Sequence, residues 1–170
     1  MAYAVPRGAL SALRIRGPWT KGLVVGIPIG ICVQLVAVAA FLVVQRVVSD
    51  FSPEKAMGVI EREFQTFSLS AKVALLAVGG VVGPVAEELL FRGVLLYGLQ
   101  LIKGRWGKAF AAIGSAALFA AVHLNAWAFV AFLVLGLILA GMTIKTGSVS
   151  YAIGTHIGFN LAAFGALLLR

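Results

Sequence analysis

Two adjacent glutamates lie in the middle of an apolar run, where an acidic side chain is costly. The stretch reads GPVAEELLFRG, residues 83–93, inside the apolar run 73–102. Ionisable side chains at membrane depth cost at least about 2.5 kcal/mol each on insertion scales, so they usually pair or serve a function. Glu88 and Arg92 are four positions apart, which places both on one face of a helix. We therefore predict a charge-assisted, structural Glu88–Arg92 pair.

Glu87 has no such partner on its own helix. It is rotated by about 100° from Glu88 and precedes Arg92 by five residues, so it cannot share the pair from an ideal helix. A carboxylate in this position needs a cation, a metal or a proton from another segment. Glu87 is therefore a candidate catalytic or metal-binding residue.

Both histidines of the chain lie in apolar runs downstream of Glu87. Phe119 stands one turn before His123 in FAAVH, and Asn160 stands one turn after His156 in HIGFN. Two histidines and one carboxylate can hold a catalytic zinc with one position open for water. Without a metal, Glu87 could act as general base on a water that the histidines orient. Asn160 could hold a ring, a substrate backbone or an oxyanion.

A structural role stays open for each of these residues. A single histidine in a helical membrane protein is more often a hydrogen-bonded packing residue than a ligand. Phe119 taken alone is a core residue. The glycines of GGVVGP, residues 79–84, are close-packing positions that can also bend or break the helix. The coincidence of both histidines with an unpaired glutamate favours the functional interpretation.

The elements that position these residues are expected to be membrane helices. Of the 170 residues 61% are hydrophobic and only 12% charged, and the mean hydropathy is +1.04, far above that of a soluble domain. We predict one integral membrane domain over residues 1–170 with an all-α fold: a polytopic bundle of about five or six membrane helices. Strands of a barrel would alternate in polarity, and these runs do not. The expected spans are 22–44, 73–102, 126–144 and 148–169, with a shorter one at 109–124.

A short amphipathic helix is expected on the membrane surface between the first two spans. Ser52 suits the N-cap and Pro53 the first helical position. Apolar residues at helical spacing lie opposite two basic ones: Met57, Ile60, Phe64 and Phe67 against Lys55 and Arg62. A helical connector packed on the bundle is an equal alternative.

The net charge of +8 is better explained by membrane topology than by nucleic acid. The basic residues flank the apolar runs, at Arg7, Arg14, Arg16 and Lys21 and at Lys103, Arg105 and Lys108. Residues 50–72 carry mixed charge, which predicts a cytoplasmic amino terminus. No nucleic-acid partner is expected. The single Cys32 excludes an internal disulfide.

At these positions the sequence resembles the CAAX-protease and bacteriocin-processing (CPBP, or Abi) family of intramembrane proteases. Three motifs of that family occur in order, over a region of resemblance at residues 73–169. They are a glutamate pair followed after three residues by arginine (Glu87, Glu88, Arg92), Phe-x3-His (Phe119, His123) and His-x3-Asn (His156, Asn160).

The resemblance implies an endopeptidase that hydrolyses a peptide bond within or near the bilayer. Glu87 would activate water, while His123, His156 and Asn160 would hold metal, water or the tetrahedral oxyanion. Zn²⁺ on Glu87, His123 and His156 and a metal-free glutamate mechanism are both compatible with the family. The structural support of the site would come from Glu88, Arg92 and Phe119.

The resemblance also implies partners and a location. The substrate would be a membrane-embedded or lipidated peptide or protein in the lipid bilayer. The compact chain without targeting extensions predicts a prokaryotic cytoplasmic (inner) membrane. The chain is short for the family, so an oligomer or a partner subunit is an open expectation. Two alternatives of other classes stay open: a non-catalytic scaffold or assembly factor of the same fold, and a proton or ion path through the polar cluster.

A simple up-and-down threading does not bring the three candidate side chains to one depth. It puts Glu87 near mid-membrane, His123 toward the outer end of its segment, and His156 about 12 Å in from the cytoplasmic side at about 1.5 Å per residue. Either the third segment is displaced and tilted, or the run from Val73 is broken near Pro84.

Overall fold

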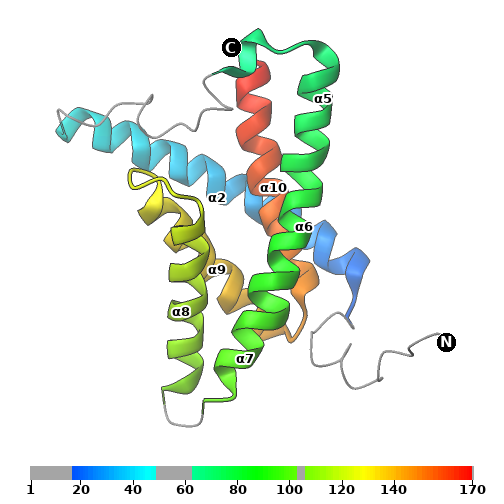
Figure 1. Cartoon of the computed structure of the whole chain (residues 1–170), viewed down its shortest axis with the longest axis vertical. Coiled ribbons are helices and arrows are strands. Elements are labelled where there is room, and N and C mark those ends of the chain that lie inside the picture. Colours follow the sequence, from blue (N-terminus) through cyan, green and yellow to red (C-terminus); the bar gives the residue numbers. More distant parts are fainter. Residues whose placement is uncertain (1–16, 49–62, 103–105, 170) are drawn as a thin grey trace.

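The computed structural model describes residues 17–48, 63–102 and 106–169. Within these ranges the chain is helical and contains no strand, which confirms the all-α prediction (Figure 1). The longer elements are α2 (Trp19–Val47), α5 (Leu69–Ala77), α6 (Gly83–Glu88), α7 (Leu96–Gln100), α8 (Gly107–Val122), α9 (Phe129–Thr146) and α10 (Val149–Leu168).

One continuous helical path carries the glutamates. It comprises α5, α6 and α7, joined by two π-helical segments, η2 (Val78–Val82) and η3 (Leu89–Leu95). Figure 1 shows this path running the whole height of the molecule. The glycines and the proline before Glu87 therefore change the helical register but do not break the path, so the count of spans here is unchanged.

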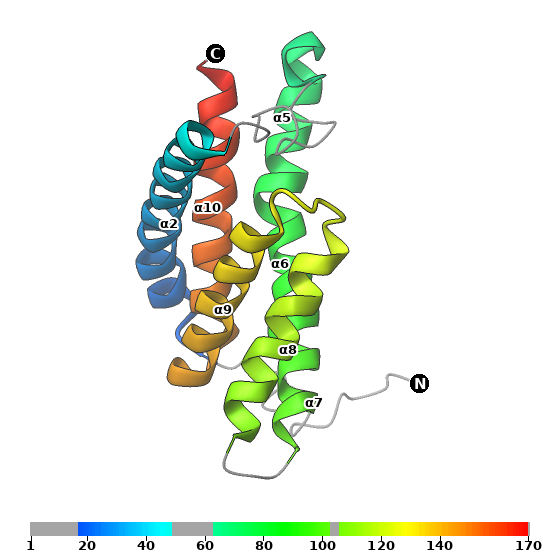
Figure 2. The same cartoon turned by 90° about the vertical axis from the view of Figure 1, so that its left-hand side faces the viewer.

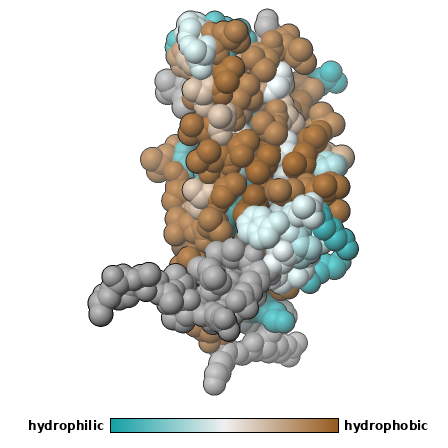
Figure 3. All heavy atoms as spheres, turned by 90° about the vertical axis from the view of Figure 1, so that its right-hand side faces the viewer, coloured by the Kyte–Doolittle hydropathy of each residue, from teal (hydrophilic) through white to brown (hydrophobic). Residues whose placement is uncertain are grey.

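Four helical paths in the described ranges are long and apolar enough to cross a membrane. They are Trp19–Val47, Leu69–Gln100, Phe129–Thr146 and Val149–Leu168. Helix α8 has 16 residues and is a shorter apolar helix beside them (Figure 2). Hydrophobic residues cover most of the described surface on the face in Figure 3, as a lipid-facing surface requires. The prediction of an integral membrane bundle is thus supported by length, composition and surface.

Helix α10 lies at the centre of the bundle and contacts α2, α6 and α9. Its contact with α2 brings backbone against backbone. A Cβ atom added to Gly26 would lie 2.6 Å from the carbonyl oxygen of Tyr151 and 2.7 Å from the nitrogen of Thr155. A Cβ on Gly158 would overlap the carbonyl oxygen of Ile27. Glycine at these positions allows the close approach that drives helix association in lipid.

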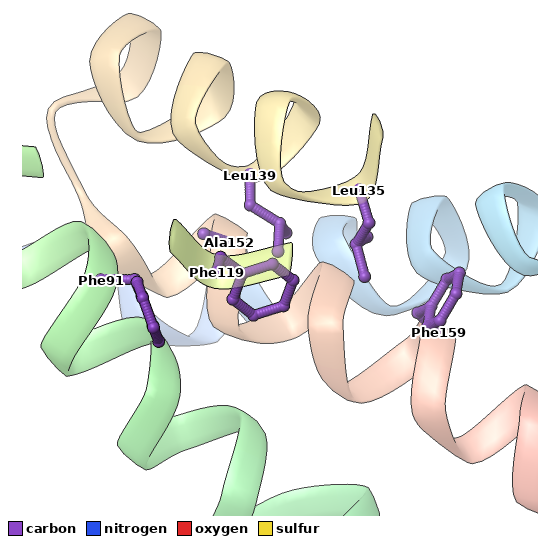
Figure 4. Packing of buried hydrophobic residues seen from close by; sticks show 6 residues of the cluster. All are labelled: Phe91, Phe119, Leu135, Leu139, Ala152 and Phe159. Atoms are coloured by element: carbon purple, nitrogen blue, oxygen red, sulfur yellow. The ribbon is translucent and has the colours of Figure 1, made fainter. Parts of the chain in front are cut away.

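A cluster of buried hydrophobic residues fills the space between η3, α8, α9 and α10. Figure 4 shows its members, Phe91, Phe119, Leu135, Leu139, Ala152 and Phe159. Phe119 is fully buried, and its ring meets that of Phe91 edge to face at 5.4 Å between centroids. The packing role expected of Phe119 is therefore present, and its further contacts belong to the site.

The predicted surface helix falls mostly on residues 49–62, which lie outside the described ranges, as do Arg7, Arg14, Arg16, Lys103 and Arg105. The adjoining turn η1 (Phe64–Thr66) is described and packs on the bundle. Phe64 is fully buried, and its ring centroid lies 6.3 Å from that of Phe164 on α10. Gln65 also donates a hydrogen bond to the carbonyl of Leu167 at 2.6 Å. At this end the segment has the packed character of a connector.

Candidate active site

Glu87, His123 and His156 come together from three different helical segments. The Nε2 atoms of His123 and His156 each lie 4.0 Å from Oε2 of Glu87. The depths converge because α8 is short: Figure 2 shows it ending beside α6 while α5 continues beyond. His123 is the residue that follows α8, so it lies at the level of Glu87. Of the two alternatives raised by the threading, a displaced third segment is the one observed.

The ring of His123 is held in one orientation by its own helix and by two aromatic side chains. Its Nδ1 lies 2.7 Å from the carbonyl oxygen of Phe119, and a carbonyl can only accept, so Nδ1 donates. In the neutral ring Nε2 is then an acceptor, and it faces Glu87. The ring stacks on Phe132 of α9 at 4.0 Å and meets Phe119 edge-on at 4.8 Å.

Phe132 was not singled out from the sequence. It is one apolar residue among many in the run that forms α9, and no spacing relates it to His123. Only the packing of α9 against the end of α8 reveals its contact with the imidazole.

The ring of His156 is oriented by Glu88. Its Nδ1 lies 3.0 Å from Oε1 of Glu88, the same oxygen that accepts a hydrogen bond from Nη1 of Arg92 at 2.9 Å. Nδ1 therefore donates to the carboxylate, and Nε2 of the neutral ring is an acceptor directed at Glu87. All three residues of this group are buried. The predicted Glu88–Arg92 pair is confirmed, and Glu88 has a second partner that the spacing did not indicate.

Arg92 connects this group to two further parts of the bundle. Its Nη2 donates to the carbonyl of Gly136 on α9 at 3.0 Å. Its guanidinium carbon lies 4.5 Å from the centroid of the Phe119 ring, a cation–π contact in a site away from water. Arg92 thus fixes Glu88, and through Glu88 the ring of His156, relative to α8 and α9.

The centre of the site contains three hydrogen-bond acceptors and no donor among the described residues. Oε2 of Glu87 is buried and has no hydrogen-bond partner there, and the Nε2 lone pairs of His123 and His156 point toward it. Acceptors that face one another in this way need a proton, a cation or a water between them. The Glu87 side chain as a whole is 38% exposed, so the residue lies at the edge of the bundle although Oε2 itself is covered.

The three atoms at this centre are of the types that bind zinc. The distances between them are longer than those between the ligands of a bound zinc ion. Two imidazole nitrogens and a carboxylate oxygen are zinc ligands, and ligands of tetrahedral zinc stand about 3.3 Å apart at the usual bond lengths. The pairs here stand at 4.0 Å, and the described part of the chain holds no group of three or more His, Cys, Asp or Glu at metal-binding spacing. The donation of each Nδ1 to an oxygen is what metal-binding histidines show. A metal would therefore need the side chains to close by some tenths of an ångström.

Asn160 lies on α10 one turn after His156, but its described contact is elsewhere. Its Nδ2 donates to the carbonyl oxygen of Gly79 in η2 at 2.9 Å. Glu87, His123 and His156 are thus brought together as expected, while the amide of Asn160 is directed at the backbone of the neighbouring helix.

Comparison with protein-family models gives a match to the region of the chain that carries the candidate site. Residues 69–162, more than half of the chain, match a protein-family model described as Rce1-like, type II CAAX prenyl endopeptidase Rce1-like. No curated protein and no solved structure matches the chain. The matched region contains all seven residues of the three motifs and leaves α2 outside.

Proposed function

This chain belongs to the type II CAAX prenyl endopeptidase Rce1-like family, and we propose that it is an intramembrane endopeptidase that cleaves a membrane-associated peptide or protein. The family suggests CAAX-type protease activity. The observation that carries the proposal for these residues is the pair of 4.0 Å approaches of two histidine Nε2 atoms to one oxygen of Glu87.

A water molecule suits this centre chemically. Its two protons can be accepted by Glu87 Oε2 and by one imidazole Nε2, so its oxygen lone pairs are free for attack. Glu87 takes a proton as the oxygen bonds to the carbonyl carbon, and it returns that proton to the leaving nitrogen when the C–N bond breaks. Glu88 and Arg92 hold the His156 ring, and Phe119 and Phe132 hold the His123 ring, so both nitrogens stay directed at the water.

We propose Glu87, His123 and His156 as the ligands if the enzyme uses Zn²⁺. The metal would supply a water of lowered pKa and would polarise the carbonyl of the substrate. A metal-free mechanism on Glu87 uses the same residues. Metal analysis of the purified protein separates the two: stoichiometric zinc, lost in both His123→Ala and His156→Ala, is expected for the metalloenzyme. A folded wild type prepared without chelators and free of metal would contradict it.

The proposed substrate is a membrane-embedded or lipidated peptide or protein, because Glu87 is partly exposed beside the exposed apolar residues Ala86 and Leu90. The bilayer that holds the protein would present such a substrate directly. A prokaryotic cytoplasmic (inner) membrane with a cytoplasmic amino terminus, and an oligomer or partner subunit, remain predictions from the sequence.

Replacement of Glu87 by Gln tests the proposed hydrolysis. In proteoliposomes with a set of prenylated and unmodified membrane-anchored peptides, mass spectrometry is expected to show product with wild type. The rate should fall by about 10²–10⁴-fold in Glu87→Gln, the contribution typical of a general base. Glu63→Gln is the matched control, since Glu63 is exposed and outside the site. Cleavage by Glu87→Gln at the wild-type rate would exclude Glu87 as the base.

A further inference from the structure

Pro84 removes a backbone hydrogen-bond donor three residues before Glu87. It lies in the first turn of α6 and is fully buried. The segment before it, η2, is π-helical, and the N–H of Gly83 donates to the carbonyl of Val78, five residues back. In that register the next donor, at position 84, would serve the carbonyl of Gly79, but proline has no N–H.

The Gly79 carbonyl therefore lacks both of the backbone N–H groups that could bond to it within a helix, those four and five residues further along the chain. The N–H four residues on belongs to Gly83 and is directed at Val78, and the N–H five residues on does not exist in Pro84. Inside a membrane, a carbonyl without a donor is costly because no water replaces the lost bond. The side chain of Asn160 supplies the donor, with Nδ2 at 2.9 Å from the Gly79 oxygen.

The two glycines of η2 let α10 come close enough for this bond. A Cβ on Gly79 would lie 2.9 Å from Cζ of Phe164, and a Cβ on Gly80 would lie 2.9 Å from Cδ2 of Leu161. Asn160 is one turn from His156 on α10, and Gly79 is two turns from Glu87 on the partner path. The bond thus joins the helix that carries Glu87 to the helix that carries His156.

We propose that Asn160 is a positioning residue that replaces the backbone donor missing at Pro84 and so sets the position of Glu87 relative to His156. The predicted effect of Asn160 on cleavage rests on the proposed function. Its predicted effect on the packing of α10 against the helix that carries Glu87 does not. A shift of about 1 Å in the reacting groups can lower a rate by about 10²-fold, so a bond remote from the water can matter for the rate.

Restoring the backbone donor tests this role directly. Asn160→Leu removes the side-chain donor, and Pro84→Ala returns an N–H at position 84. We expect Asn160→Leu to lower the unfolding temperature by about 2–4 °C and the cleavage rate by at least about tenfold. Pro84→Ala in the same chain should recover most of both losses. If Asn160→Leu does not fold, folding of the double variant is the recovery that is measured.

A matched control removes a proline elsewhere. Pro28 lies inside α2, away from η2, so Pro28→Ala should not recover Asn160→Leu. Failure of Pro84→Ala to recover stability, or equal recovery by Pro28→Ala, would overturn the proposal. Recovery of stability without recovery of cleavage would overturn it too, because Asn160 would then act on the reacting atoms. If no wild-type cleavage is found, the proposed hydrolysis fails, and the unfolding temperatures still decide the role of Asn160 in pairing.

Discussion

Helix α10 meets its two main neighbours in different ways. Against α2 it presents glycines and backbone, and a Cβ added to Gly26 or to Gly158 would collide with backbone atoms of the other helix. Against the path of α5–α7 it presents polar side chains, His156 to Glu88 at 3.0 Å and Asn160 to Gly79 at 2.9 Å.

The difference separates two tasks of the same helix. In lipid there is no hydrophobic drive between helices, so van der Waals contact at small residues and hydrogen bonds between helices hold the bundle. The contact with α2 uses van der Waals contact at small residues and contains none of the residues proposed for catalysis. The contact with the α5–α7 path uses hydrogen bonds, and the residues that make it also direct the proposed catalytic groups. Only the second contact lies wholly within the region that matches the family.

The largest effect is expected from breaking the polar contact at Glu88. Glu88→Ala leaves Arg92 buried without its carboxylate, and loss of one partner of a buried pair costs about 3–5 kcal/mol. Glu87→Ala is the matched control beside it, and should leave stability nearly unchanged because Oε2 of Glu87 has no hydrogen-bond partner among the described residues. Thermal unfolding in detergent measures both. Equal losses in the two variants would contradict the separation of a structural from a functional glutamate.

A smaller effect is expected from the glycine contact. Gly158→Ala places a methyl group on the carbonyl of Ile27, and overpacking of this kind costs about 1–3 kcal/mol. Gly165→Ala is made on the same helix where a Cβ would meet nothing within 4 Å, so it should be neutral or slightly stabilising. If Gly158→Ala and Gly165→Ala unfold at the same temperature, close approach of α2 is not what the glycine provides.

The parts of the site that are local in sequence could be predicted, and the parts that depend on helix ends could not. The Glu88–Arg92 pair follows from a separation of four residues on a helix. The threading placed His123 too far out because it assumed that its segment crosses the full thickness, whereas α8 ends after 16 residues. The ordered motifs did indicate the convergence, without giving its geometry.

The partner of Asn160 needed the register of a neighbouring helix. GGVVGP is visible in the sequence, but bending, breaking and a π-helical turn are all compatible with its glycines and proline. Only the observed bond from Gly83 to Val78 shows which carbonyl loses its donor. Phe132 was missed for a similar reason, since its contact with His123 is created by packing and not by any spacing along the chain.

Glu88 accepts hydrogen bonds from two residues that the ribosome makes at very different times. Arg92 is only four positions later, so the pair can form as soon as this helix does and can enter the bilayer as a neutral unit. His156 follows 68 positions later. Until α10 has been inserted, Glu87 therefore lacks one of the two imidazoles that face it. The centre proposed to activate water is therefore complete only when α10 has joined the helices that precede it in the chain.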